Sequence, residues 1–510
     1  MVALALVLAL IGAALLFAWL PGRASSAAAA ASSAPANPFS STTAEEEKPT
    51  PKPLRGTWLV KEQQGRKLWA EELARKGIDP ATTIPLGNGY LLPDSEVKHV
   101  KIIGATGMGK SMAIKHILAR VTERPEQRAV VVDLNGSYAK LFYRPERGDR
   151  IVNPFDARDC GWNIAAELTQ PYHAGSLSRA LIPSQEGHGK EWAEYAQKLV
   201  AATLAALKSR GDLSVESLYA TLSATPPGEY AELVAGTNAA KLFAPDNERF
   251  RASVEAIVSS NTSGLQYMRT GPFSLNSYAL SSEDKGWIFL TYTADQLESL
   301  RTIIAAMLRI VIFSLISRPE EDSGTWLIID ELAAIGKIDG LLEALTLLRK
   351  FGGRCVLAFQ SLGPLVETYG HGISSALVEN CNSTLLLRTS SGATMSTAQF
   401  AAGLVGDREV LRAEHNTSKS TGSSFTPASL TRFSPASSRN ANSGSTTRRV
   451  TEHAVMPSQI EQLQTLHGYV HSDDSSFWSR CTIEPYTAEP VAEAFVTRIE
   501  PAVDAAELAT

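Results

Sequence analysis

The sequence predicts an α/β fold with a mostly parallel sheet, an inserted all-α domain and an N-terminal transmembrane helix. Three features support this prediction: a glycine-rich loop between an apolar strand and a helix, apolar strands that alternate with helices, and an uncharged apolar segment at the start. At 510 residues the chain is too long for one hydrophobic core, so we expect two or three domains.

The overall composition excludes a protein that binds nucleic acid through a high total positive charge. The formal net charge is -5, so any contact with nucleic acid must be local, on a few loops or in a channel lined by several subunits. The cysteines are far apart in the sequence and form no C-x-x-C pair: Cys160, Cys355, Cys381 and Cys481. We therefore expect reduced thiols, which suit a reducing compartment.

The first segment of the chain is apolar, and residues 2–20 contain no charge. Because a helix of roughly 20 such residues spans the core of a bilayer, we interpret residues 1–23 as a transmembrane anchor. A cleaved signal peptide is the alternative; small residues after the run favour it, and the lack of a basic segment before the run disfavours it. Positive charges follow the helix from Arg23 onward, which places the bulk of the chain in the cytoplasm.

Residues 24–53 are rich in Ala, Ser and Pro and cannot bury enough apolar surface to fold. They predict a flexible linker. Globular sequence begins at Leu54, with a strand expected at 56–60, a helix at 68–76 and a strand at 90–92.

The strongest motif fits G-x-x-x-x-G-K-[ST] at every fixed position: Gly104-Ala105-Thr106-Gly107-Met108-Gly109-Lys110-Ser111. It lies between a predicted strand at residues 100–103 and a predicted helix at 111–121. Glycines let backbone N–H groups approach phosphates closely, while Lys110 contacts the β- and γ-phosphates and the Ser111 hydroxyl holds Mg²⁺. The motif predicts a site for ATP and Mg²⁺; a glycine-rich structural loop is the alternative, and it leaves Lys-Ser at the helix start unexplained.

A continuous apolar run at residues 129–133 predicts a strand buried on both faces of a parallel sheet, with Asp133 at its carboxyl end. Two roles for Asp133 remain open, a ligand-binding group or the cap of a turn or helix.

Strand signals then largely disappear between residues 174 and 271, where apolar residues have helical spacing. An all-helical insertion is the simplest interpretation.

The apolar stretch at residues 300–316 raises the question of a second membrane span. Arg301 and Arg309 each cost about 2.5–3.5 kcal/mol within a bilayer, so we expect a buried core helix instead.

A second candidate site element is the apolar strand at 326–329 that ends in Asp330-Glu331. Asp330 can hold the Mg²⁺ shell, and Glu331 can polarise a water aligned for attack on the γ-phosphate. Capping of a following helix is the alternative role for this acidic pair.

Two further candidates follow. Gln360 lies at the end of a predicted strand at 355–359, where its amide can sense the γ-phosphate or make a hydrogen bond within a turn. Arg349 lies in a predicted helix at 341–350 and is either an arginine finger for a neighbouring subunit or an ordinary solvated arginine.

Residues 417–447 are dominated by Ser, Thr, Asn and Ala, and the region between Glu414 and Glu452 carries basic residues but no acidic one. We expect a disordered basic loop, which either touches DNA or has no function. The tail after Glu484 is expected to be poorly ordered.

The spaced set of motifs resembles the type IV coupling proteins of bacterial conjugation, the TraD-like DNA-translocating ATPases. The resemblance covers about residues 55–470 and rests on the phosphate loop together with the segments Ile-Asp-Glu-Leu at 329–332, Leu-Arg-Lys-Phe-Gly-Gly at 348–353, Phe-Gln-Ser at 359–361 and Val-Met-Pro-Ser-Gln-Ile at 455–460.

The resemblance implies a RecA-like P-loop NTPase domain with an inserted all-α domain and a membrane anchor. It also implies a homo-hexamer that docks on a type IV secretion channel in the bacterial inner membrane and moves single-stranded DNA with its attached relaxase. The site roles it implies are nucleotide and Mg²⁺ binding for Lys110 and Ser111, metal and water binding for Asp330 and Glu331, sensing for Gln360, and the trans arginine for Arg349. Family members usually carry two membrane helices, and one is visible here.

These observations divide the chain into an anchor (1–23), a linker (24–53), the first part of the nucleotide-binding domain (54–173), the all-α insertion (174–271), the second part of the nucleotide-binding domain (272–484) and a C-terminal tail (485–510). Two other functions compete with the conjugative motor. One is a double-stranded DNA pump of the segregation type, although no winged-helix DNA reader is recognisable. The other is a nucleotide-switched membrane receptor for protein cargo.

Overall fold

The structure is a computed structural model that describes residues 50–499, apart from 51, 186, 188, 320–323, 391–395 and 424–436. The predicted anchor at 1–23 and almost all of the predicted linker lie outside the described residues. Among the residues that are described, no helix combines the length and the apolar character needed to cross a bilayer.

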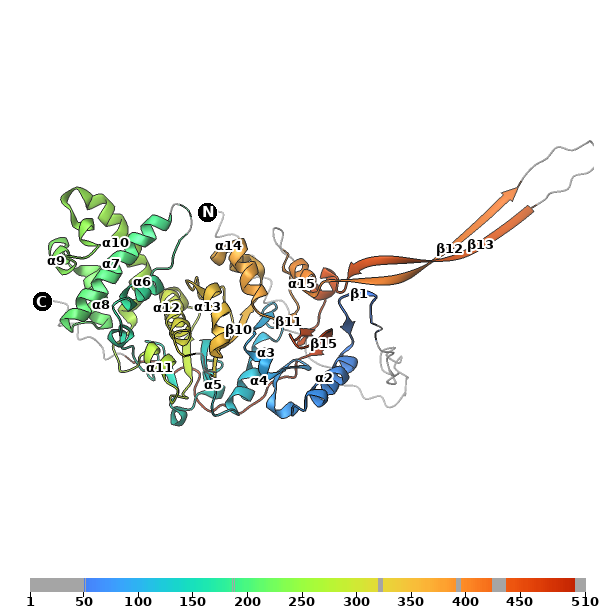
Figure 1. The fold of residues 1–510 in the computed structure, drawn as a ribbon, viewed down its shortest axis with the longest axis horizontal. Helices are drawn as coiled ribbons and strands as arrows, with labels where there is room; N and C mark the ends of the chain where they lie inside the picture. Colours follow the sequence, from blue (N-terminus) through green and yellow to red (C-terminus); the bar gives the residue numbers. More distant parts are fainter. Residues whose placement is uncertain are drawn as a thin grey trace, which may run out of the picture. The chain divides into compact units, whose positions relative to one another are not determined.

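A ten-stranded sheet organises the described part of the chain (Figure 1). Its strands are parallel from β11 to β7, while β14 runs antiparallel to both of its neighbours, so the sheet is mostly parallel as predicted. The order across the sheet is β2 (Leu59–Val60), β15 (Trp478–Thr482), β14 (His467–His471), β11 (Ser383–Leu387), β5 (Val100–Ile103), β10 (Arg354–Phe359), β9 (Thr325–Ile329), β6 (Arg128–Leu134), β8 (Ile288–Tyr292) and β7 (Arg150–Val152).

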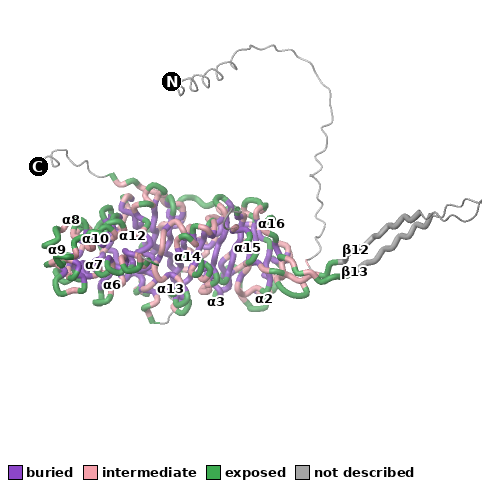
Figure 2. Tube along the Cα trace, turned by 90° about the horizontal axis from the view of Figure 1, so that it is seen from above, coloured by how far each residue is buried: buried purple, intermediate pink, exposed green. Residues whose placement is uncertain are grey.

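Each central strand is apolar on both faces because helices cover both faces of the sheet. Alternate residues of β6 join different hydrophobic clusters: Val130 and Val132 pack in one, and Ala129 and Val131 pack in the other. Figure 2 shows the buried residues concentrated in the interior beside α12, α14 and α15. The helices are α4 (Lys110–Thr122) and α5 (Ala139–Phe142) on one face, and α12 (Leu297–Leu315), α13 (Leu341–Leu348), α14 (Leu362–Glu379) and α15 (Thr397–Val405) on the other.

Helix α12 is the segment for which a second membrane span was considered, and its burial in the core confirms the expected core helix. Its Arg309 side chain is buried and donates to two protein carbonyls: Nε donates to Asp339 O at 3.0 Å and Nη1 donates to Ser176 O at 3.0 Å. The arginine thus joins α12 to α6 rather than facing lipid.

The predicted all-helical segment at 174–271 consists of helices joined by turns and loops, and no described residue between β7 and β8 belongs to a strand. Figure 1 shows α7, α8, α9 and α10 grouped together. The helices are α6 (His173–Leu181), α7 (Gly189–Arg210), α8 (Val215–Ala224), α9 (Pro227–Leu233), α10 (Glu248–Thr262) and α11 (Leu275–Leu280).

The predicted disordered loop at 417–447 is instead largely a two-stranded ribbon, drawn as the two long paired arrows of Figure 1. Strands β12 (Asp407–Ser423) and β13 (Ser437–His453) pair antiparallel from Asp407↔His453 to Ser423↔Ser437. Backbone hydrogen bonds can form this ladder without an apolar face, so composition alone gave the wrong expectation. Residues 424–436 lie outside the described part.

The segment after Glu484 also differs from the poorly ordered tail that was expected. Residues 485–499 are held by backbone contacts: Val491 N–H donates to Lys140 O at 2.9 Å, and Ala157 N–H donates to Val496 O at 2.8 Å. Such contacts depend on the folded surface beneath them and leave no periodic pattern in the sequence. Residues 500–510 are not described.

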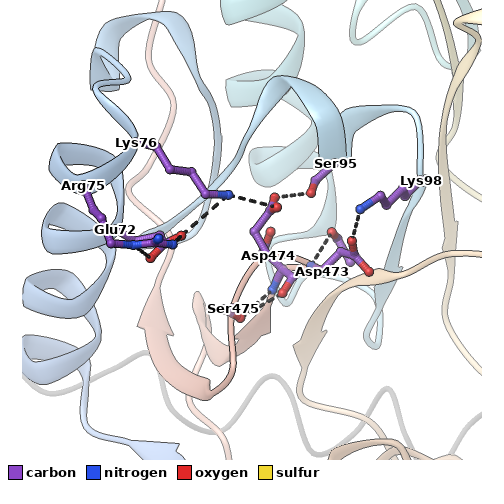
Figure 3. Close-up of polar contacts among 10 residues, drawn as sticks. Glu72, Arg75, Lys76, Ser95, Lys98, Asp473, Asp474 and Ser475 are labelled. Atoms are coloured by element: carbon purple, nitrogen blue, oxygen red, sulfur yellow. Dashed lines mark hydrogen bonds and ion pairs between the residues drawn. The ribbon is translucent and has the colours of Figure 1, made fainter.

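The edge where the parallel strands begin is tied together by polar contacts. The β14–β15 turn places Asp473 and Asp474 against other elements: Asp473 accepts from Lys98, and Asp474 accepts from Ser95 and pairs with Lys76 of α2 (Glu62–Lys76) (Figure 3). These contacts join α2, α3 (Pro93–Glu96), the segment after α3 and the antiparallel end of the sheet.

His99 lies at this same edge, directly before β5, and is buried with a left-handed φ of 61°. Its Nε2 is 3.0 Å from Leu345 O, and its Nδ1 accepts from Cys355 N–H at 3.2 Å. A neutral ring protonated on Nε2 satisfies both contacts. Burial lowers the pKa of His99 to about 4, and the nearby positive charge of Arg349 also lowers it.

We expect this neutral histidine to make stability depend on pH. The unfolded chain binds a proton at His99 below about pH 6.5, whereas the folded chain resists protonation until about pH 4, so the free energy of unfolding should fall as the pH is lowered through this window. The loss should reach up to about 3 kcal/mol. Urea unfolding at a series of pH values should show this slope, and His99→Asn should flatten it; parallel curves for the two proteins would contradict the assignment.

Candidate nucleotide-binding site

The phosphate loop connects β5 to α4 and needs glycine at three positions. Gly107 and Gly109 have φ values of 75° and 116°, and the backbone of residues other than glycine rarely adopts such angles. A Cβ on Gly104 would lie 2.7 Å from Leu387 Cβ, and one on Gly109 would lie 2.8 Å from Leu466 Cδ2. The loop therefore presents bare backbone at the N-terminus of α4, where its N–H groups can face an anion.

Backbone hydrogen bonds from three elements fix this loop in place. Gly104 N–H donates to Phe359 O at 3.2 Å, Ala105 N–H donates to Arg388 O at 2.7 Å, and Leu466 N–H donates to Met108 O at 3.1 Å. The loop is thus held by the carboxyl ends of its two neighbouring strands and by the segment that enters β14.

Lys110 is the first residue of α4 and is buried. Its Nζ donates to Gly104 O at 2.8 Å. Burial lowers the pKa of Lys110, while the carboxylates of Glu331 and Asp330 oppose this shift. The ammonium group therefore lies between the loop and the acidic pair.

The acidic pair directly follows β9, and its first member contacts the phosphate-loop helix. Ser111 Oγ donates to Asp330 Oδ2 at 2.9 Å, and Tyr138 OH donates to the same oxygen at 2.7 Å. Asp330 Oδ1 and Glu331 Oε2 are buried oxygens that have no hydrogen-bond partner among the described residues. Such oxygens fit Mg²⁺ or an ordered water, since both satisfy carboxylate lone pairs.

Glu331 and Gln360 lie next to each other beyond the ends of β9 and β10. Burial raises the pKa of Glu331, and the charge of Lys110 and hydrogen bonds from Gln360 oppose the rise. Gln360 Oε1 in turn accepts from Thr106 Oγ1 at 2.7 Å. The Gln360 amide therefore links the phosphate loop to the residue predicted to position water.

The two roles left open for Asp133 can be compared directly. Asp133 is fully buried and accepts hydrogen bonds from Tyr138 N–H, Ala139 N–H and Ser137 Oγ, so it caps the turn that starts α5. Burial raises the pKa of Asp133 to about 7. The carboxyl group thus positions Tyr138, a residue that the sequence analysis missed because a tyrosine after an Asn-Gly turn belongs to no motif.

Arg349 does not join these residues within one chain. It opens the 3₁₀ turn η7 (Arg349–Phe351) directly before β10 and is exposed. Because β10 and β5 are parallel, Arg349 lies at the edge where the strands begin, and the phosphate loop lies at the edge where they end. The other predicted site residues, Lys110, Ser111, Asp330, Glu331 and Gln360, all lie at the latter edge.

Comparisons with known proteins agree with this geometry. A family model described as the type IV secretion-system coupling protein DNA-binding domain matches residues 84–484. Coupling protein TraD of Escherichia coli (strain K12) is 28% identical over 354 residues, which are 68% of this chain and 48% of that protein. The chain therefore spans about half the length of this curated relative.

Solved structures of the bacterial conjugative coupling protein TrwB are also similar. The unbound form of TrwBdeltaN70 has a TM-score of 0.75 and 27% identity, covering 88% of this chain and 97% of that chain. TrwB in complex with ADP and Mg²⁺ has a TM-score of 0.74 and 27% identity, and the complex with a non-hydrolysable ATP analogue has 0.74 and 26%; each covers 88% of this chain and 98% of that chain.

Tyr138→Phe should weaken the binding of Mg²⁺ with nucleotide, because it removes the hydrogen bond that orients Asp330 and keeps the packed ring. Loss of such a supporting contact typically weakens metal affinity by about 10- to 100-fold. Titration of a fluorescent ATP analogue should show the loss with Mg²⁺ present and little change with EDTA. Tyr143→Phe is the matched control, since its ring faces Arg158; equal Mg²⁺ affinity in both variants would exclude the proposed contact.

Proposed function

Since the chain belongs to the family of type IV secretion-system coupling proteins, we propose that it is an ATP-driven DNA translocase of the bacterial inner membrane. It couples single-stranded DNA, with its attached relaxase, to a type IV secretion channel. The observation that carries the enzymatic part is the meeting of the phosphate loop and the acidic pair, where Ser111 contacts Asp330 and two buried carboxylate oxygens stay unpartnered among the described residues.

ATP and Mg²⁺ are the cofactors of this proposal. Structures of the relative TrwB contain a non-hydrolysable ATP analogue in one case and ADP with Mg²⁺ in another. In this chain Ser111 and Asp330 would hold the metal, and residues 104–111 would hold the phosphates. Bound Mg²⁺ supplies positive charge that offsets the charge of the β- and γ-phosphates.

The remaining residues divide the chemistry of hydrolysis. Lys110 places its ammonium group against the phosphates, where negative charge increases in the transition state. Glu331 orients and polarises the attacking water, for which a carboxylate with a raised pKa is suited. Gln360 senses whether the γ-phosphate is present, and its hydrogen bond with Thr106 connects this response to the phosphate loop.

Arg349 completes the site from a neighbouring subunit. Its place at the opposite edge of the sheet prevents it from serving the phosphate loop of its own chain. An arginine supplied in trans stabilises transition-state charge and makes each site depend on its neighbour. This requirement supports a closed homo-hexameric ring, in which the sites hydrolyse ATP one after another and DNA passes along the centre.

The DNA cargo and the channel rest on the family, and the membrane location rests on residues 1–23. The matching family model is described as a DNA-binding domain, which supports DNA as the translocated partner. A single anchor at residues 1–23 would hold the ring at the inner membrane with the ATPase domain in the cytoplasm.

ATP hydrolysis by the full-length protein in detergent should rise severalfold when single-stranded DNA is added. Lys110→Ala should abolish the activity, and Glu331→Gln should bind ATP normally while its rate falls by about 100-fold or more, because water activation is lost. The measurement is steady-state phosphate release, with nucleotide binding followed separately.

The same assay is run with duplex DNA, and other outcomes would contradict different parts of the proposal. Stimulation by duplex DNA alone would favour the segregation-type pump. Nucleotide binding without a response to either form of DNA would favour the receptor for protein cargo. Wild-type turnover in Glu331→Gln would show that another group positions the water.

Deletion of residues 1–53 should release the protein from the membrane. We expect the truncated protein in the supernatant after ultracentrifugation of a cell lysate, and the full-length protein in the membrane pellet even after carbonate washing. A truncated protein that still sediments with membranes would contradict the anchor at residues 1–23.

A further inference from the structure

We propose that His99, together with the Glu96–Arg354 ion pair, clamps the turn that carries Arg349 and so positions this arginine for the active site of a neighbouring subunit. The inference rests on the proposed function, in which Arg349 acts in trans. His99, Glu96 and Arg354 are positioning residues here, since none of them lies at the phosphate loop.

The turn to be positioned runs from the end of α13 to the start of β10 and reverses the chain sharply. Gly352 has a φ of 65°, and Gly353 N–H donates back to Leu348 O at 3.0 Å. A Cβ on Gly353 would lie 2.3 Å from Leu348 Cγ. The turn is therefore closely packed at its base, while the Arg349 side chain at its surface is exposed.

His99 holds both ends of this turn at once. Its Nε2–H donates to Leu345 O in the last turn of α13, and its Nδ1 accepts from Cys355 N–H at the start of β10. One buried ring thus fixes the separation between the helix that enters the turn and the strand that leaves it. A shorter side chain at this position could not reach both groups.

The ion pair holds the middle of the turn. Arg354 Nη1 donates to Gly352 O at 2.6 Å, and Arg354 Nε donates to Glu96 at 3.0 Å. Glu96 is buried and also accepts from Arg124 at 2.9 Å, so its carboxylate is fixed from two sides. A buried charge held in this way gives the Gly352 carbonyl a rigid partner.

His99 and Glu96, one residue of each clamp, belong to the segment directly before β5. Glu96 ends α3, His99 precedes Val100, and the phosphate loop starts at Gly104. The clamp for the arginine and the chain's own phosphate loop therefore lie at the two ends of one buried strand. A long, flexible arginine gains a defined position only when its base is rigid, which explains why such groups lie beneath an exposed side chain.

The test compares His99→Asn with the wild type in the full-length protein. Asparagine tolerates the left-handed backbone at this position, but its side chain cannot bridge Leu345 and Cys355. We expect kcat for ATP hydrolysis to fall by about tenfold or more, with ATP affinity changed by less than about twofold, because the phosphate loop is intact. Arg354→Lys, which keeps a positive charge beside Glu96, should give the same split between kcat and affinity.

Two controls separate positioning from loss of stability. His471→Asn removes another, partly buried histidine, whose ring contacts Phe477 O and stacks on Trp478, and its kcat should stay close to the wild type. Mixed oligomers give the directional test. Mixed with Lys110→Ala subunits, which still supply a well-placed Arg349, the His99→Asn subunits should regain activity; mixed with Arg349→Ala subunits, they should not.

The outcomes distinguish this inference from the proposed function. Unchanged kcat in Arg349→Ala would overturn the trans arginine itself. Loss of activity in Arg349→Ala with unchanged kcat in His99→Asn would overturn only the clamp. Failure of Lys110→Ala subunits to rescue His99→Asn, while they rescue Arg349→Ala, would show that His99 acts within its own site and would also overturn the clamp.

Discussion

The place of β10 between β5 and β9 determines the geometry of the whole site. Adjacent strands lie about 4.8 Å apart, and β10 lies between β5 and β9. The strand that leads to the phosphate loop and the strand that leads to the acidic pair are therefore roughly 10 Å apart across the sheet. Ser111 and Tyr138 reach into this gap and meet at one oxygen of Asp330. Gln360, at the tip of the intervening strand, lies where it can contact both sides.

Two buried charges outside the site, those of Arg128 and Glu96, contrast with the acidic pair inside it. Arg128 is buried and donates to the carbonyls of Tyr278, Ala279 and Asp284, and Glu96 is held by two arginines. A buried charge is stable only when hydrogen bonds or opposite charges replace its lost hydration, as they do at these two residues. Asp330 Oδ1 and Glu331 Oε2 lack hydrogen-bond partners among the described residues, which fits groups whose partners are a metal ion and a water.

The parts of the fold that could be predicted from the sequence are those that depend on residues close to one another in the chain. The strand, glycine turn and helix around Lys110, and the apolar strand before Asp330, carry their own periodicity and spacing, so the parallel sheet and the acidic pair were within reach. Tyr138 and His99 were not, because their functions depend on contacts with residues 192 and 246 positions away. The β12–β13 ribbon was missed because it forms through backbone pairing that its composition does not signal.

In the proposed ring, strand β5 would give a physical reason for coupling between subunits. One end of this four-residue strand enters the phosphate loop, and the other end emerges from the segment that holds the arginine turn. All four residues are buried, and β10 and β11 flank the strand on either side, so it cannot shift without disturbing both neighbours. A change in the phosphate loop of one subunit would therefore be transmitted most directly to the base of the arginine that it offers to the next. In a ring, this arrangement would let the sheet itself set the order in which the subunits hydrolyse ATP. No additional structural element would be needed to pass the change between subunits.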